Sequence, residues 1–62
     1  MAGQCFEIDI RFESNRWLVR IPPEINDATE ATARDEVELA ARECIAARTG
    51  IPIGYISVWV RD

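Results

Sequence analysis

The sequence predicts a small α+β domain in which one helix packs on one face of an antiparallel sheet, in the order β-β-β-α-β. Three observations predict this fold. Two early segments alternate apolar and polar residues as the strands of a hairpin do, a later segment repeats apolar residues at helical spacing, and a last segment alternates again. We expect strands near residues 4–13, 16–21, 28–33 and 55–61, and a helix over residues 36–49.

The first two strands are expected to form a tight hairpin. Residues 5–13 read CFEIDIRFE and residues 16–21 read RWLVRI, with Ser14 and Asn15 between them. Asn tolerates the positive φ that two-residue hairpin turns require. One register sets apolar residues opposite each other on one face and opposite charges together on the other. Its pairs are Glu13–Arg16, Phe12–Trp17, Ile10–Val19, Asp9–Arg20 and Ile8–Ile21.

The helix has a clear end and an ambiguous beginning. Apolar residues recur at helical spacing over residues 36–49, and Gly50 supplies the left-handed residue that ends many helices. Asp27 could cap one long helix. Alternatively, residues 28–33 could form a short third strand, followed by a helix that Asp35 caps. Within the helix, Glu38 and Arg42 are spaced for an ion pair.

Length and composition restrict the function. The 62 residues make one domain, 1–62, with a net charge of −4, no Lys and no His. Nucleic acid is a poor partner for an acidic chain, and two distant Cys without His make no metal site. No segment could span a membrane, and no secretory signal is visible, so we expect a cytoplasmic protein. Because so short a chain has a thin core, we expect a homo-oligomer.

No residue pattern indicates an enzyme or a cofactor. Nucleophile–His pairs are impossible without His, and the three Gly are scattered rather than gathered in a phosphate-binding loop. The carboxylates near the helix start could form an acid–base site, but a solvated helix face is the better interpretation. These carboxylates are Asp35, Glu36, Glu38 and Glu43.

The polar side of the strands carries a candidate binding surface. Aromatic residues and arginines at one place are typical of protein interfaces. The two alternatives are aromatic rings that only lie over a sheet edge and a nucleic-acid face on which the rings stack bases. The candidate residues are Leu18, Arg20, Tyr55, Trp59, Arg16 and Arg11.

The order of these elements resembles the HicB family, the antitoxin halves of bacterial toxin–antitoxin pairs. The chain is similar in particular to short stand-alone HicB-like proteins of actinobacteria and their phages. The matching residues are Trp17, Ile21-Pro22, Glu24-Ile25, Thr29, Ala41-Arg42-Glu43 and Thr49-Gly50-Ile51-Pro52. The chain has Glu24-Ile25-Asn26-Asp27 where typical members have a Gly-rich turn. Typical members continue into a DNA-binding domain, and we expect this chain, which stops at Asp62, to lack it.

The resemblance implies three strands before the helix, and it therefore favours the strand at residues 28–33. It also implies a non-enzymatic antitoxin that sequesters a small, basic RNase toxin. An orphan or phage protein with a changed partner and a free-standing nucleic-acid-binding protein are the alternatives.

Overall fold

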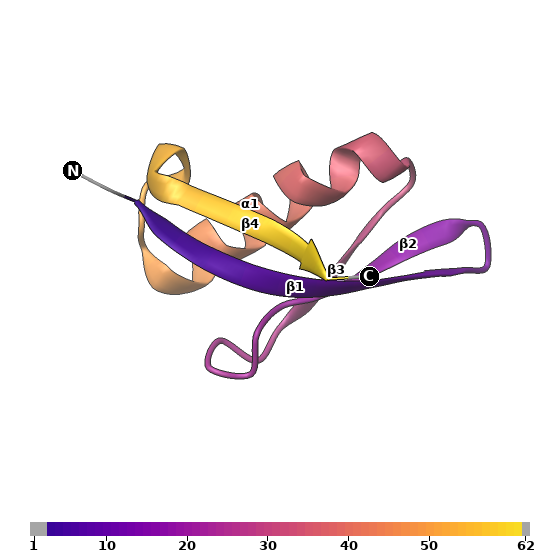
Figure 1. Cartoon of the computed structure of the whole chain (residues 1–62), viewed down its shortest axis with the longest axis horizontal. Coiled ribbons are helices and arrows are strands. Elements are labelled where there is room, and N and C mark those ends of the chain that lie inside the picture. The colour runs from indigo at the N-terminus through magenta and orange to yellow at the C-terminus, as the bar shows by residue number, and fades with distance from the viewer. Residues whose placement is uncertain (1–2, 62) are drawn as a thin grey trace.

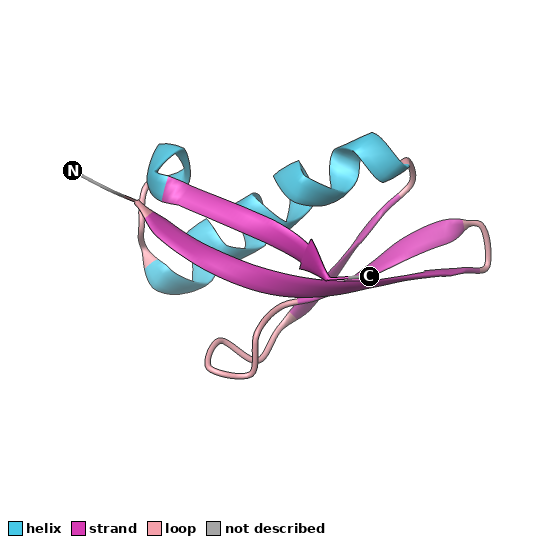
Figure 2. Cartoon of the chain, in the orientation of Figure 1, coloured by secondary structure: helices cyan, strands magenta, loops and turns pink. Residues whose placement is uncertain are grey.

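The computed structural model describes residues 3–61 and confirms a small α+β fold with one helix packed on a four-stranded sheet (Figures 1 and 2). The strand order in the sheet is β3-β2-β1-β4. The elements are β1 (Gln4–Glu13), β2 (Arg16–Arg20), β3 (Ala28–Ala31), η1 (Arg34–Glu36), α1 (Val37–Thr49), η2 (Ile53–Tyr55) and β4 (Ile56–Arg61).

The hairpin has the predicted register. β1 and β2 pair antiparallel with Glu13 opposite Arg16 and Asp9 opposite Arg20. Ser14 and Asn15 have φ of 54° and 63°, the left-handed values of a two-residue hairpin turn. Ile21 lies one residue beyond β2, so its predicted pairing with Ile8 falls outside the ladder.

The direction of β4 corrects the expected antiparallel sheet, because β4 runs parallel to β1. The cause is the connection. β3 runs antiparallel to β2 and therefore in the direction of β1, α1 returns along the sheet, and β4 then runs in that direction again. Alternation along a strand indicates which face a residue occupies and gives no information on strand direction.

The third strand is present, but Asp35 does not cap the helix. β3 ends at Ala31, and Asp35 lies inside the 3₁₀ turn η1 that leads into α1. Glu36 occupies the N-cap position, without a side-chain capping bond. Gly50 ends the helix in the left-handed conformation, at φ 79°, as expected. Among residues 3–61, no helix is both long and apolar enough to cross a membrane.

The core lies between α1 and the sheet. Its fully buried side chains come from all four strands, from the helix and from the residue after β2. They are Ile8, Val19, Ile21, Ala31, Val37, Ala41, Ile45 and Ile56. Phe12, expected in this core, is 56% exposed. Figure 1 shows the reason, since the hairpin tip projects past the N-terminal start of the helix.

Candidate functional site on the open face of the sheet

The sheet face turned away from α1 carries the candidate site, and we call it the open face. Cross-strand partners share a face, so the registers of the three strand pairs define its members. The charged members are Glu7, Asp9, Glu13, Glu30, Arg11, Arg16, Arg20 and Arg61. The uncharged members are Cys5, Leu18, Ala28, Ser57 and Trp59.

The structure brings five of the six predicted site residues onto this face. They are Leu18, Arg11, Arg16, Arg20 and Trp59. Tyr55 is the exception, because it lies in the 3₁₀ turn η2 just before β4. Its side chain is 53% exposed. β4 begins only at Ile56, and the sequence pattern did not reveal that Tyr55 lies outside the strand.

A shallow hollow of about 340 Å³ lies over β2. Half-buried Leu18 is the largest apolar side chain of the open face that lines it, and Asp9 and Arg20 are charged neighbours. Arg20 makes no ion pair with any other residue in the described range 3–61, although it is opposite Asp9 in the ladder. The expected Asp9–Arg20 ion pair is therefore wrong, and both charges are available to a ligand.

Most other charges of the open face are paired with one another. The Arg16 Nη1 lies 2.9 Å from Glu30 Oε1, so Arg16 reaches β3 rather than the expected partner Glu13. Glu13 instead lies 3.3 Å from Arg11. These pairs are exposed, and each contributes about 0–1 kcal/mol to folding stability. Four carboxylates and four guanidinium groups balance to zero net charge on this face.

Trp59 is the most exposed large apolar side chain of the described chain, at 67%. Its indole Nε1 donates a hydrogen bond to Cys5 Sγ at 2.6 Å. The contact holds the ring over the β1–β4 ladder, beside Glu7. An oriented, exposed aromatic ring on a strand is a typical anchor for a protein partner.

Most of the acidic excess lies away from the open face. Among residues 3–61, the remaining carboxylates number six and the remaining arginines three, and all belong to α1, η1 and the loop before β3. The carboxylates are Glu24, Asp27, Asp35, Glu36, Glu38 and Glu43. The arginines are Arg34, Arg42 and Arg48. Glu24 lies beside Asp9 and Arg20 of the open face. The other five carboxylates outnumber the three arginines and make the helix side acidic, whereas the charges of the open-face strands balance.

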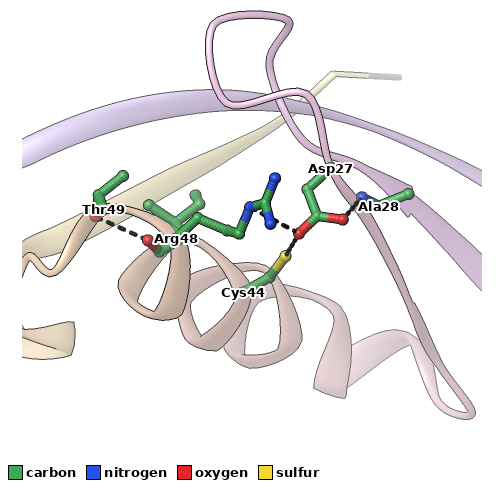
Figure 3. Close-up of polar contacts among 6 residues, drawn as sticks. Asp27, Ala28, Cys44, Arg48 and Thr49 are labelled. Atoms are coloured by element: carbon green, nitrogen blue, oxygen red, sulfur yellow. Dashed lines mark hydrogen bonds and ion pairs between the residues drawn. The ribbon is translucent and has the colours of Figure 1, made fainter.

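A second polar cluster ties the loop before β3 to the helix (Figure 3). Asp27 Oδ1 accepts the main-chain N–H of Ala28 at 2.8 Å. Its Oδ2 accepts the Cys44 thiol at 3.4 Å and lies 3.4 Å from Arg48 Nε. The Ala28 and Cys44 hydrogen bonds, with a smaller contribution from Arg48, hold the Asp27 pKa below its ordinary value. The cluster is a structural link that the sequence pattern did not indicate.

Two of the four carboxylates near the helix start make local contacts. Glu38 pairs with Arg34 at 3.1 Å rather than with the expected Arg42, and the Arg34 hydrogen bond lowers the Glu38 pKa. Glu36 accepts a hydrogen bond from the Thr32 hydroxyl at 3.1 Å. Within residues 3–61, no three His, Cys, Asp or Glu side chains are grouped as metal ligands would be.

Family models, curated protein sequences and solved structures were each compared with the chain, and none of the three comparisons found a match. Fold and site define the class of the protein. It is a small α+β domain whose mixed sheet has one face covered by a helix and one face open.

Proposed function

We propose that the chain is a non-enzymatic protein-binding module that holds a small partner protein on the open face. The observation that supports this most is the composition of that face. It combines the exposed ring of Trp59, the hollow at Leu18 and a balanced set of charges. Protein interfaces have this mixture of an aromatic anchor, an apolar centre and a polar rim.

The same face is a poor surface for nucleic acid, the alternative function. Phosphate binding requires a net positive surface, because affinity comes from counterions that the bound arginines displace. Here each arginine is matched by a carboxylate on the same face, and Arg16 is engaged with Glu30. A strand of phosphates would therefore meet as many negative groups as positive ones.

The proposed partner is a small, basic protein. The acidic helix side gives the molecule a long-range negative field, which speeds the approach of a basic partner. The resemblance to the HicB family supports the same partner, since it implies an antitoxin that sequesters a basic RNase toxin. The two free thiols, Cys5 and Cys44, support a reducing compartment such as the cytoplasm.

The test compares variants of the open face with a matched variant of the helix. Wild type, Trp59→Arg and Leu39→Arg would serve as baits in pull-downs from the native cell. Leu39 is an exposed apolar residue of α1, so Leu39→Arg adds the same charge on the opposite side. We expect one protein partner that wild type and Leu39→Arg retain and Trp59→Arg loses at least about tenfold, a change typical of an interface anchor.

A parallel shift assay with RNA and DNA at low salt addresses the alternative. Tight nucleic-acid binding without any recovered protein would contradict the proposal. Equal recovery of the partner by Trp59→Arg and wild type would show that binding occurs elsewhere on the molecule.

A further inference from the structure

Among residues 3–61, no strand pairs with the outer edge of β4. β4 is the last strand of the order β3-β2-β1-β4, and its six residues read ISVWVR. Proteins protect sheet edges with proline, inward-pointing charges, bulges or very short strands, and β4 has none of these. The opposite edge, β3, has four residues, and its Glu30 is held by Arg16. β4 is therefore the edge that suits strand addition.

The hairpin register determines which main-chain groups of β4 point outward. The residues that flank a two-residue turn bond to each other, so the main-chain groups of Glu13 point toward β2. Going back along β1 from Glu13, every second residue also directs its N–H and C=O groups toward β2. The residues between them, such as Phe6, direct these groups toward β4. Phe6 has Val58 as its Cα partner. In a parallel ladder, its groups then meet those of Ser57 and Trp59.

The residues between those two point the other way. The outward N–H and C=O groups are those of Ile56, Val58 and Val60. One outward donor is already used, since the Ile56 N–H donates to the carbonyl of Ile53. The Val58 and Val60 amides are thus the donors that the β4 edge offers to another chain.

We propose that a second copy of this chain adds its β4 to this edge, antiparallel, about a two-fold axis at Val58. The two sheets then form one continuous eight-stranded sheet, twice the four strands of a single copy. In this register Val58 lies opposite the second copy's Val58, Ile56 opposite its Val60, and Ser57 opposite its Trp59. This occupant goes beyond the proposed function, because the new contact is main-chain pairing at a sheet edge. Of the open-face residues, Ser57 and Trp59 lie at the seam, and the hollow at Leu18 stays free.

The side chains are self-complementary in this register. On the helix side, apolar Ile56 meets the equally apolar Val60, and both copies contribute the same pair. On the open face, Trp59 lies opposite Ser57, whose small side chain leaves room for the indole. If one β4 strand shifted by one residue along the other, the apolar side chains of one copy would lie beside the open-face side chains of the other.

The charge distribution favours a second copy at this edge. Residues 51–61 contain no carboxylate, and Arg61 is their one charged residue. The acidic excess of each copy lies on α1, η1 and the loop before β3. At physiological salt, repulsion between exposed charges further apart than about 8 Å is largely screened.

The experiment follows the amides of ¹⁵N-labelled full-length protein over a concentration series from about 10 µM to about 1 mM, with sedimentation velocity on the same samples. We expect a monomer–dimer equilibrium. The Val58 and Val60 amides should shift with concentration and gain protection from hydrogen exchange. The Ser57 and Trp59 amides, which face β1, should stay protected at every concentration.

Two proline variants form a matched pair. Val58→Pro removes an outward donor, so the β1–β4 ladder stays intact while the dimer weakens by about tenfold or more. Ser57→Pro removes an inward donor and should destabilise the monomer itself. Leu18→Glu, on the open face, should leave dimerisation unchanged, which separates this proposal from the proposed function.

Three outcomes would overturn the inference. The first is a protein that stays monomeric up to the highest concentration. The second is a dimer whose concentration-dependent amides lie in β3 or on the hairpin rather than in β4. The third is a folded Val58→Pro that dimerises as wild type does. Because the amide data come from the wild-type protein, the inference remains testable even if Val58→Pro does not fold.

Discussion

Asp27 and Cys44 are joined by a hydrogen bond of 3.4 Å from the thiol to the carboxylate, across 17 positions of sequence. The contact fixes the loop before β3 against the middle of α1, and Arg48 reaches the same oxygen from the next turn of the helix (Figure 3). The three groups make the stability of the fold sensitive to the ionisation of Asp27.

Acid should weaken this link in a predictable pH range. The pKa of Asp27 is lowered from 3.8, chiefly by the Ala28 and Cys44 hydrogen bonds. A carboxyl whose pKa is lower in the folded state stabilises the fold above its unfolded pKa, and the stabilisation is lost as the pH falls through the folded pKa. The Tm of wild type should therefore fall more steeply than that of Asp27→Asn between about pH 5 and about pH 2.5.

Thermal unfolding followed by circular dichroism measures this difference. Glu24→Gln serves as the control, because Glu24 is an exposed carboxylate of the same loop and should leave the wild-type slope unchanged. Identical slopes for wild type and Asp27→Asn would show that the link contributes nothing to folding.

The two cysteines should differ in reactivity. Burial, followed by the Asp27 hydrogen bond, raises the pKa of the Cys44 thiol, whereas Cys5 is exposed on the open face. The thiolate is the nucleophile, so Cys44 should react with iodoacetamide at least about tenfold more slowly than Cys5 near neutral pH. Peptide mass spectrometry after timed alkylation measures both rates. Asp27→Asn should speed Cys44 alone, and equal rates in the wild type would contradict the structure.

Ile8 and Phe12 lie on the same strand face but should respond differently to truncation. Ile8 is fully buried under α1, so Ile8→Ala should reduce the free energy of unfolding by about 2–5 kcal/mol. For a domain of this size, such a loss leaves little stability. Phe12 is mostly exposed and retains chiefly the ring of Trp17 as a neighbour, at a centroid distance of 5.0 Å. Phe12→Ala should remove less than about 1.5 kcal/mol, near the value of one aromatic pair.

Urea denaturation of both variants tests this ranking. A loss for Phe12→Ala as large as that for Ile8→Ala would show that the hairpin tip is covered in solution, for example by another chain.

The hairpin and its faces were predictable because the pattern is local. Period-two alternation assigns each residue to a face of the sheet. With the turn at Ser14 and Asn15, only one register pairs apolar residues with apolar residues and acids with arginines. The same parity brought five of the six candidate residues onto one face. Which side chains form ion pairs was not predictable. Arg16 forms its ion pair with Glu30 of β3, because a long side chain can reach a diagonal neighbour on the next strand as easily as the residue directly opposite.

Features that depend on the path of the chain were also beyond the sequence pattern. The parallel direction of β4 follows from the helical crossover between β3 and β4. The exposure of Phe12 follows from how far α1 extends along the hairpin. The hollow at Leu18 requires β3 beside β2, and the sequence alone left open whether residues 28–33 were strand or helix.

Arg34 connects the hairpin to the start of the helix, and this contact provides the last prediction. Its guanidinium carbon lies 5.9 Å from the ring centroid of Trp17, and its Nη1 lies 3.1 Å from the carboxylate of Glu38. A cation over an aromatic ring at an exposed site contributes about 0.5–1 kcal/mol. A double-mutant cycle of Arg34→Ala and Trp17→Leu should give a coupling of that size, measured by urea denaturation with circular dichroism. The matched cycle of Arg42→Ala and Trp17→Leu should be additive within about 0.5 kcal/mol, since Arg42 lies further along α1. An additive Arg34–Trp17 cycle would mean that the guanidinium is held by Glu38 alone.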